Sequence, residues 1–430
     1  MKIGTDSFHL TYCTNIHPGE AWQEVFTNLK HYIPALKVRL SPTEPFGIGL
    51  RLANFAAQEL LEGDNLAQFQ SWLSEQNLYV FTLNGFPYGG FHHQVLKEQV
   101  YAPDWSTQER LDYTLRLAKI LAALLPAGMD GGISTVPLSY KSWWKENSDK
   151  KNSEFGVQSS EFEFSQNESI LNSTNTAFKK SSSHLALVTA EMVRLREETG
   201  KRVHLDLEPE PDGLLENAAE VIDFFQNWLL PTGGAELAEC LGISQESAEH
   251  QLLEHICVCY DTCHFAVEYE APASAIQRLQ AAGIQIGKIQ LSAAIQVTLP
   301  ELPQEQNLVM ERLRPFAEST YLHQVIERRK DGTFSHYPDL DQALSHLEQS
   351  AAQEWRTHFH VPIFIRDYHH LQSTQDHLIT VLELLQDNHA CKHLEIETYT
   401  WDVLPAEMKT DLLSSIQREY EWVLGRMKDE

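Results

Sequence analysis

Short apolar runs alternate with amphipathic helical stretches along almost the whole chain, and this rhythm constrains the fold more than any other feature. The stretch after the first run carries an apolar stripe at helical spacing, made of Trp22, Val25, Phe26, Leu29, Ile33 and Leu36. Alternating β and α units predict a mainly parallel sheet covered by helices. The apolar runs are residues 10–15, 46–52, 79–84, 133–138, 203–208, 256–261, 286–291, 358–364 and 393–398.

The number of runs favours a closed (β/α)8 barrel, the TIM barrel of the α/β class, over an open doubly wound sheet. One barrel accounts for residues 1–430 as a single domain. Because nine runs are one too many, residues 300–370 are interpreted as an insertion between late strands, with a hairpin over 321–337. Residues 146–184 are rich in Ser and Asn, and they are predicted to form a flexible insertion.

Charge and composition narrow the classes of partner. The net charge of −27, from 60 acidic and 33 basic residues, disfavours nucleic acid and anionic lipid. No run of 18 apolar residues and no signal-peptide pattern occur, so we expect a cytoplasmic protein that does not insert into a membrane. The spacing of the six cysteines is not that of a disulfide framework, which fits a reducing compartment.

Carboxylates and imidazoles follow two of the late strands. Glu208 ends the run 203–208 and is separated from Glu210 by a proline, and Asp261 ends the run 256–261 and is followed by His264. In a (β/α)8 barrel the carboxyl ends of all strands converge on one face, where active sites lie. Mixed oxygen and nitrogen ligands suit hard or borderline divalent cations. The sequence therefore predicts a metal site at this face.

The last two barrel strands add inward-facing polar residues. Glu395 and Glu397 share one face of the final strand, and inward carboxylates are costly without a cation or partner. Glu397, nearer the strand end, is the better ligand, whereas Glu395 also suits an ion pair one layer deeper. Gln290 is interpreted equally well as a cation or substrate ligand and as a buried amide that bonds its neighbours.

Other polar positions carry weaker signals. His358 and His360 share one face of their run, and ligation or structural hydrogen bonding both explain them. Asn84 and Phe86 place an amide and an aromatic ring at a strand end, which suits stacking on a sugar ring or a tight turn. His92 follows the same strand.

A set of strand-end motifs resembles the xylose-isomerase-like TIM barrels, a superfamily that includes sugar epimerases, hydroxypyruvate isomerase and endonuclease IV. The motifs are Tyr260–His264, Leu207–Glu208 and Ile396–Thr398. The resemblance implies one to three divalent ions held by Glu208, Asp261, position 290 and Glu397. It makes His264 a ligand of the substrate or of a second ion. Position 290 is Gln here, where the superfamily usually has His, which puts the identity of the metal in question.

A longer set of blocks is similar to the bacterial metabolite traffic protein EboE family. The blocks are LTYCTNIHPGEAW, TLNGFPYGGFH, VYAPDW, ISTVPLSYK, LEPEPDGLLE, CYDTCHFAVEYE, KIQLSAA, YLHQV, HFHVPIF and HLEIETYTWDVLP. This resemblance implies a role in moving secondary-metabolite precursors, such as the scytonemin monomer, out of the cytosol. The implied partners are a small metabolite and the other proteins of the ebo cluster, which include a membrane prenyltransferase-like protein.

These observations lead to three functional hypotheses. The first is a sugar- or cyclitol-type isomerase or epimerase that uses a divalent ion (Mn, Zn, Co or Fe) as a Lewis acid. The second is metal-dependent hydrolysis of a small phosphoester, and the third is a non-catalytic metabolite-binding accessory protein. The predicted metal ligands are Glu208, Asp261, Gln290, His360 and Glu397. The predicted catalytic residues are Glu210, His264 and Glu395. The predicted substrate-binding residues are Asn84, Phe86, His92 and Gln290.

Overall fold

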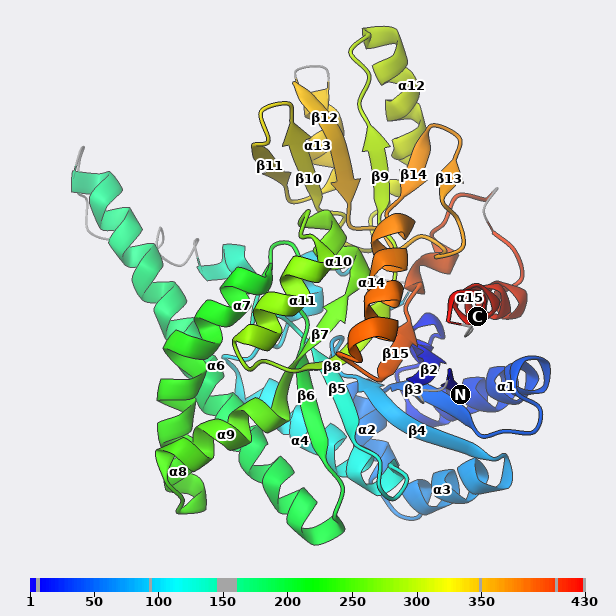
Figure 1. Cartoon of the computed structure of the whole chain (residues 1–430), viewed down its shortest axis with the longest axis vertical. Coiled ribbons are helices and arrows are strands. Elements are labelled where there is room, and N and C mark those ends of the chain that lie inside the picture. The colour runs from blue at the N-terminus through cyan, green and yellow to red at the C-terminus, as the bar shows by residue number, and fades with distance from the viewer. Residues whose placement is uncertain (5–7, 93–94, 145–160, 348–349, 407–408, 428–430) are drawn as a thin grey trace.

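The computed structural model describes residues 1–4, 8–92, 95–144, 161–347, 350–406 and 409–427. Its centre is a parallel sheet in the order β2-β15-β8-β7-β6-β5-β4-β3, and a parallel bridge between Cys13 and Gly49 joins the two ends into a barrel (Figure 1). A short strand β1 (Lys2–Ile3) pairs antiparallel with β2. The predicted (β/α)8 fold is confirmed by this strand order. The barrel strands are β2 (Phe8–Tyr12), β3 (Phe46–Arg51), β4 (Leu78–Asn84), β5 (Gly131–Thr135), β6 (Val203–Leu207), β7 (Ile256–Asp261), β8 (Ile286–Leu291) and β15 (His393–Ile396).

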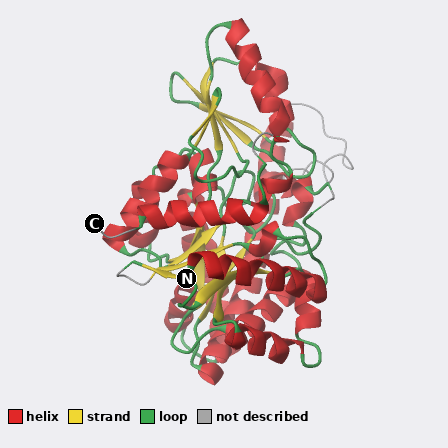
Figure 2. Cartoon of the chain, turned by 90° about the vertical axis from the view of Figure 1, so that its right-hand side faces the viewer, coloured by secondary structure: helices red, strands yellow, loops and turns green. Residues whose placement is uncertain are grey.

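Helices surround the barrel and bury their apolar stripes against it (Figures 1 and 2). The helix α1, for example, buries the whole stripe from Trp22 to Leu36 that its sequence shows. The α-helices are α1 (Trp22–Leu40), α2 (Asn54–Leu60), α3 (Asn65–Glu75), α4 (Gln108–Leu124), α6 (Glu161–Thr199), α7 (Ala218–Phe224), α8 (Gly234–Leu241), α9 (Gln245–His255), α10 (Thr262–Val267), α11 (Pro272–Ala281), α14 (Gln375–Asn388) and α15 (Leu412–Arg426). Shorter or wider turns are η1 (Thr14–Ile16), η2 (Lys97–Tyr101), the π-helical η3 (Phe225–Gly233), η4 (Arg314–Phe316) and η6 (Tyr399–Asp402).

The barrel interior carries a buried ion pair. Lys288 Nζ lies 2.6 Å from Glu395 Oε2, and both side chains are fully buried. Gly49 on β3 makes room for this pair, because a Cβ atom there would lie 1.8 Å from Glu395 Oε1. Glu395 is therefore enclosed in the lumen, below the strand ends.

A second, antiparallel sheet stands over the carboxyl ends of the barrel strands (Figures 1 and 2). It lies between β8 and β15 in the sequence, where the insertion was predicted, and β10 and β11 form a hairpin. We call residues 295–373 the cap. Its strands, in sheet order, are β11 (Phe334–Tyr337), β10 (Val325–Arg329), β12 (Ala352–Thr357), β9 (Ile295–Thr298), β14 (Leu371–Ser373) and β13 (Asp367–Tyr368), and its helices are α12 (Pro303–Leu313) and α13 (Leu340–His346).

Two segments differ from the sequence-based expectation. The strand expected over 358–364 is instead β12, which ends at Thr357. Beyond it the chain leaves the sheet, His358 faces His264, and His360 Nδ1 bonds the Glu397 carbonyl oxygen. Of the segment 146–184, residues 146–160 lie outside the described part of the chain. From Glu161 onward the chain is helical, and Ser181 and Ser182 are buried on that helix, where tertiary packing outweighs the weak helix propensity of serine.

Within the described residues, no helix combines the length and the apolar character needed to cross a bilayer.

Candidate metal centre

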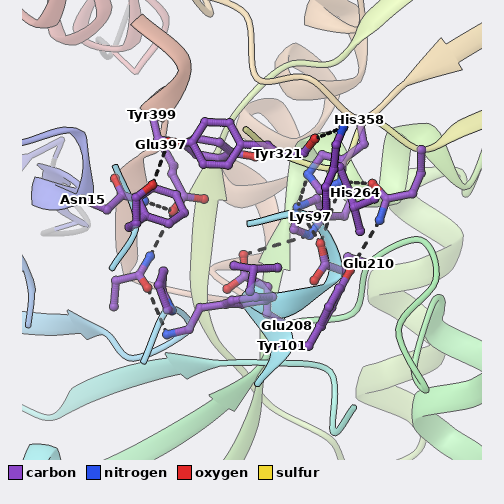
Figure 3. Close-up of a pocket in the computed structure, with 17 residues that line it drawn as sticks. Asn15, Lys97, Tyr101, Glu208, Glu210, His264, Tyr321, His358, Glu397 and Tyr399 are labelled. Atoms are coloured by element: carbon purple, nitrogen blue, oxygen red, sulfur yellow. Dashed lines mark hydrogen bonds and ion pairs between the residues drawn. The ribbon is translucent and has the colours of Figure 1, made fainter. Parts of the chain in front are cut away.

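A pocket with about 550 Å³ of empty space, part of it open to solvent, lies at the carboxyl end of the barrel, between the strand ends and the cap (Figure 3). Carboxylates and imidazoles form its floor, and apolar and aromatic side chains form its walls. The lining residues are Asn15, Asn84, Phe86, Pro87, Phe91, Lys97, Val100, Tyr101, Glu208, Glu210, His264, Tyr321, Leu322, Gln324, His358, Glu397 and Tyr399.

Three buried histidines cluster at the floor, with ring centroids 4.6–5.7 Å apart. His264 and His358 line the cavity, whereas His360 and the nearby Asp261 lie behind its surface. The Nδ1 atom of His264 lies 3.1 Å from the Pro209 carbonyl oxygen, and that of His360 lies 2.7 Å from the Glu397 carbonyl oxygen. The Nδ1 atom of His358 lies 2.8 Å from Gln324 Oε1. Because these partners only accept hydrogen bonds, each Nδ1 carries the proton and each Nε2 presents a lone pair.

The lone pairs of two of these rings face each other. His264 Nε2 lies 3.1 Å from His358 Nε2. Two neutral acceptors at this distance repel each other unless a proton or a cation lies with them. Burial lowers the pKa of His264 to about 4 and holds that of His358 well below its usual range, so both rings are neutral at physiological pH. Neutral rings with a bonded Nδ1–H are the form in which histidine binds metals.

Asp261 contributes an oxygen to the same region while it caps α10. Its Oδ1 atom accepts bonds from the backbone N–H groups of Cys263 and His264, at 2.7 and 3.1 Å, and from Ser292 Oγ at 2.6 Å. Its Oδ2 atom has no hydrogen-bond partner among the described residues and lies 4.0 Å from His264 Nε2. Asp261 can therefore cap α10 with Oδ1 and still offer Oδ2 to a metal ion.

Two glutamates after β6 stand beside His264. Glu208 Oε1 lies 4.0 Å from His264 Nδ1, and Glu210 Oε2 lies 3.9 Å from His264 Nε2. One oxygen of each glutamate, Glu208 Oε2 and Glu210 Oε1, lacks a hydrogen-bond partner within the described chain. Burial raises the pKa of both carboxyl groups well above the usual range, and neighbouring carboxylates add to the shift.

Glu397 is held by three amide groups instead. Asn15 and Asn84 donate to its Oε1 atom, at 2.8 and 2.9 Å, and Gln290 donates to its Oε2 atom at 2.7 Å. Burial, followed by repulsion from Asp261, raises the pKa of Glu397 to about 8. Its side chain is thus oriented firmly at the edge of the floor (Figure 3).

The arrangement fits a divalent cation. In one set of side chains, Asp261, His264 and His360, the ligand atoms all lie within 4.8 Å of one another, and a second set of Glu210, His264 and His358 shares His264. Ligands about 2.0–2.2 Å from an ion in tetrahedral geometry lie roughly 3.4 Å apart, somewhat less than the 4.0 Å between Asp261 Oδ2 and His264 Nε2. Asp261 Oδ2 and His360 Nε2 are buried and lack partners in the described structure, as expected of ligand atoms. Two further sets are Glu208, Asp261 and Glu397, and Cys263, His358 and His360.

Gln290 stands behind the carboxylates. Its Nε2 atom donates to Glu208 Oε1 at 3.0 Å as well as to Glu397, and it does not line the cavity. In this orientation the amide holds two acidic side chains together rather than replacing them at an ion. These contacts match the buried-amide alternative, but Gln290 Oε1 is buried without a hydrogen-bond partner among the described residues, so Gln290 as a ligand stays a prediction.

Two other predicted site residues lie away from the cavity. Glu395 is paired with Lys288 in the lumen, so the proton-transfer role predicted for it does not match its position. His92 is half-buried, with its ring edge-on to Phe91 at 5.2 Å, and it does not line the cavity. Asn84 and Phe86 do line the cavity, Asn84 through its bond to Glu397.

Several lining residues were not predicted. Tyr399 lies two positions after Glu397 and was detectable from that spacing, as was Asn15 from its place after the first strand. Lys97, Tyr101 and Tyr321 come from loops or irregular turns, which carry no periodic signal. These positions become recognisable only when the cap is placed over the barrel.

Comparisons with known proteins add little to this description. No protein-family model matches the chain, and no curated protein matches it. Among solved structures, an IolI protein with a bound zinc atom is 11% identical, with 98% of this chain and 100% of that chain covered and a TM-score of 0.41. A probable 3-DHS dehydratase, AsbF of Bacillus anthracis, is 10% identical over 96% and 97% of the two chains, with a TM-score of 0.42.

A third solved structure is a xylose isomerase domain protein from Alicyclobacillus acidocaldarius. It is 9% identical over 98% of this chain and 100% of its own, with a TM-score of 0.40. Likenesses as loose as these carry no argument about the site, so the barrel assignment rests on the strand order.

Proposed function

We propose that this protein is a divalent-metal enzyme that moves a proton next to a carbonyl group of a small metabolite, as an isomerase or epimerase does. The observation that carries the proposal is the convergence of His264 and His360, each with Nδ1 already bonded, on the unpartnered Oδ2 atom of Asp261. A divalent ion held there would polarise the carbonyl oxygen of a bound hydroxy-carbonyl compound as a Lewis acid.

The carboxyl groups of the floor are suited to proton transfer. Glu210 and Glu397 lie on different sides of the cavity, and both line it (Figure 3). Burial raises the pKa of both carboxyl groups, and it raises that of Glu397 to about 8, where a group can both accept and release a proton near neutral pH. Glu210 has an unpartnered oxygen and is the better base, whereas Glu397 is held by amides on both oxygens.

Hydrolysis of a small phosphoester is a second candidate, and the overlap of ligand sets favours it. Glu210 and His358 lie beside the set of Asp261, His264 and His360. Because His264 Nε2 can bind only one ion, a second ion would be held by Glu210 and His358. Paired ions are typical of phosphoester hydrolysis. Metal stoichiometry separates the candidates, because isomerisation by the proposed route needs one ion and hydrolysis needs two or more.

The proposal is tested by elemental analysis of protein purified without chelator. We expect near-stoichiometric Mn, Zn, Co or Fe in the wild type, loss of metal in Asp261→Ala, and retention in Asp376→Ala, whose carboxylate is exposed. Isomerisation of hydroxy ketones should follow metal content. A wild type that stays metal-free after reconstitution would contradict both candidates.

The place of this chemistry in the cell stays a prediction. The resemblance of the sequence blocks to the metabolite traffic protein EboE family supports a secondary-metabolite precursor as substrate and the ebo-cluster proteins as partners. A pull-down of the tagged protein with the prenyltransferase-like membrane protein would test the partnership.

A further inference from the structure

We propose that the cavity takes a ligand with two parts: an oxygen-bearing head on the metal-binding floor and a flat apolar body, best an aromatic ring, between the walls. The inference about the oxygen-bearing head rests on the proposed function, whereas the inference about the apolar body rests only on the residues of the walls. The inference therefore names the substrate class as a ring-bearing hydroxy-carbonyl compound rather than a free sugar or sugar phosphate.

The walls are built largely from aromatic rings that come from separate parts of the chain. On one side Phe91, Tyr321 and Tyr399 pack together, with ring centroids 5.1–5.4 Å apart. On the other, Phe86 lies 5.9 Å from Tyr101. Rings in offset or edge-on arrangements offer a further flat ring both faces and edges to stack on.

The polar ends of Lys97 and Tyr321 are already used by the protein. Lys97 Nζ bonds the carbonyl oxygens of Glu318 and Tyr321, at 3.2 and 2.7 Å, and lies 2.6 Å from Asp339 Oδ2. The Tyr321 hydroxyl donates to the Phe91 carbonyl oxygen at 3.1 Å. These walls therefore present the aliphatic part of Lys97 and the ring of Tyr321 to a ligand, rather than their polar ends.

The side-chain amide of Gln324, which also lines the cavity, is likewise hydrogen-bonded within the protein. Gln324 Nε2 donates to the Pro211 carbonyl oxygen at 3.0 Å, and its Oε1 atom bonds His358 Nδ1. A sugar bound here would press its outer hydroxyl groups against rings without replacing their bonds to water, which is costly. A phosphate group would meet the carboxylates of the floor, while Lys97 is already paired with Asp339. An aromatic body gains from burial on the same surfaces.

Three α-hydroxy ketones with a common head test this inference by isothermal titration of the full-length, metal-loaded protein. They are 2-hydroxyacetophenone, hydroxyacetone and D-xylulose. We expect 2-hydroxyacetophenone to bind at least about tenfold more tightly than the other two, since its ring alone adds buried apolar area. Equal or tighter binding of hydroxyacetone or D-xylulose, or no binding of 2-hydroxyacetophenone, would overturn the inference.

Two variants of one wall residue locate the effect. Tyr321→Phe keeps the ring and should keep the preference for 2-hydroxyacetophenone, whereas Tyr321→Leu should lose most of it. Equal preference in the two variants, with wild-type thermal unfolding, would overturn the assignment of the ring site. Metal content is measured on the same samples, and metal-free protein is titrated in parallel. If the protein binds no metal yet prefers the aryl ketone, the proposed function fails and the inference about the walls stands.

Discussion

The tautomer and orientation of His264, His358 and His360 are set by the oxygen atoms that accept their Nδ1–H bonds. Gln324 fixes His358 because its own amide nitrogen is committed to the Pro211 carbonyl oxygen, so its Oε1 atom must face the ring. Partners of this kind orient a ligand and fix its tautomer. Gln324 thus connects the loop after β6 with the histidine that follows β12.

Replacement of Gln324 by Leu should weaken metal binding by about 10–100-fold, because His358 Nδ1 loses its acceptor and the ring its orientation. The change is measured by competition of the protein with a chromophoric chelator. Gln372→Leu, at an exposed site in the same sheet, is the matched control. Unchanged affinity in Gln324→Leu would mean that His358 is not a ligand.

The ion pair in the lumen gives a second prediction at this scale. Lys288→Met leaves Glu395 as an uncompensated buried charge and should lower the free energy of unfolding by about 3–5 kcal/mol. The double variant Lys288→Met with Glu395→Leu should recover much of this loss. Both are measured by urea denaturation, with Lys330→Met, in the exposed pair with Glu301, as a control that should change nothing measurable. A double variant less stable than Lys288→Met would contradict this account.

Single residues also show how far sequence reasoning reaches into the site. Glu208, Asp261, His264 and Glu397 were identified because each follows a barrel strand, where position alone predicts convergence. Glu395 shares a strand face with Glu397, and only its depth, which depends on the register with β8, separates their roles. That register is a tertiary property that strand alternation cannot supply.

At the scale of elements, α15 fastens the last barrel strand to the cap. Glu419 on this helix accepts a bond from Thr398 Oγ1 at 2.6 Å, directly after Glu397, and one from the Ile363 backbone N–H at 3.3 Å. The Glu419 side chain is buried, and this burial raises its pKa to about 8. One carboxyl group of the C-terminal helix therefore contacts two segments that border the site.

Glu419 should make stability depend on pH. Its pKa is raised in the folded protein, so the folded state holds the proton more tightly, and this contribution is complete below about pH 4.5 and is lost as pH rises toward 8. Glu419→Gln keeps both acceptor contacts without the titration. Its melting temperature should match that of the wild type near pH 5 and exceed it near pH 8. Glu421→Gln, at an exposed position on the same helix, should have the melting temperature of the wild type at both pH values. Parallel pH profiles of Glu419→Gln and the wild type would refute the assignment.

Elements differ in how well the sequence predicts them. The barrel strands were predicted to within a few residues because most of their residues are buried on both faces and several strands read as apolar runs. The cap sheet was recognised only as a hairpin, because strands such as β10 and β12 are only partly buried and carry charged residues. The helix α6 was missed over its Ser/Asn-rich part because its buried face uses small residues such as Ser181 and Ser182, whose type suggests a loop.

At the scale of the whole molecule, the cap and the barrel share one site. The cap supplies His358 and His360, and the barrel supplies Asp261 and His264. An ion bound by both parts stabilises only the state in which they are docked. Binding to the folded state alone adds about 2.7 kcal/mol when the free ion is at 100 times its dissociation constant.

Removal of the metal should therefore lower the melting temperature and expose the cap to protease. The chelated wild type should be cut within residues 295–373 faster than the metal-loaded protein, as followed by mass spectrometry of the fragments. Asp261→Ala should respond to neither metal nor chelator. Cleavage at the same rate with and without metal would show that the ion does not hold the cap to the barrel.

The bond from Asn15 to Glu397 spans 382 positions of the sequence. A chain made on the ribosome from its N-terminus carries Asn15 early, but its carboxylate partner emerges only after the cap and almost all of the barrel. The floor of the site is therefore completed only once β15 has been made, and a shorter chain offers the proposed ion only part of its ligands. A product that stops short of β15 lacks the completed site.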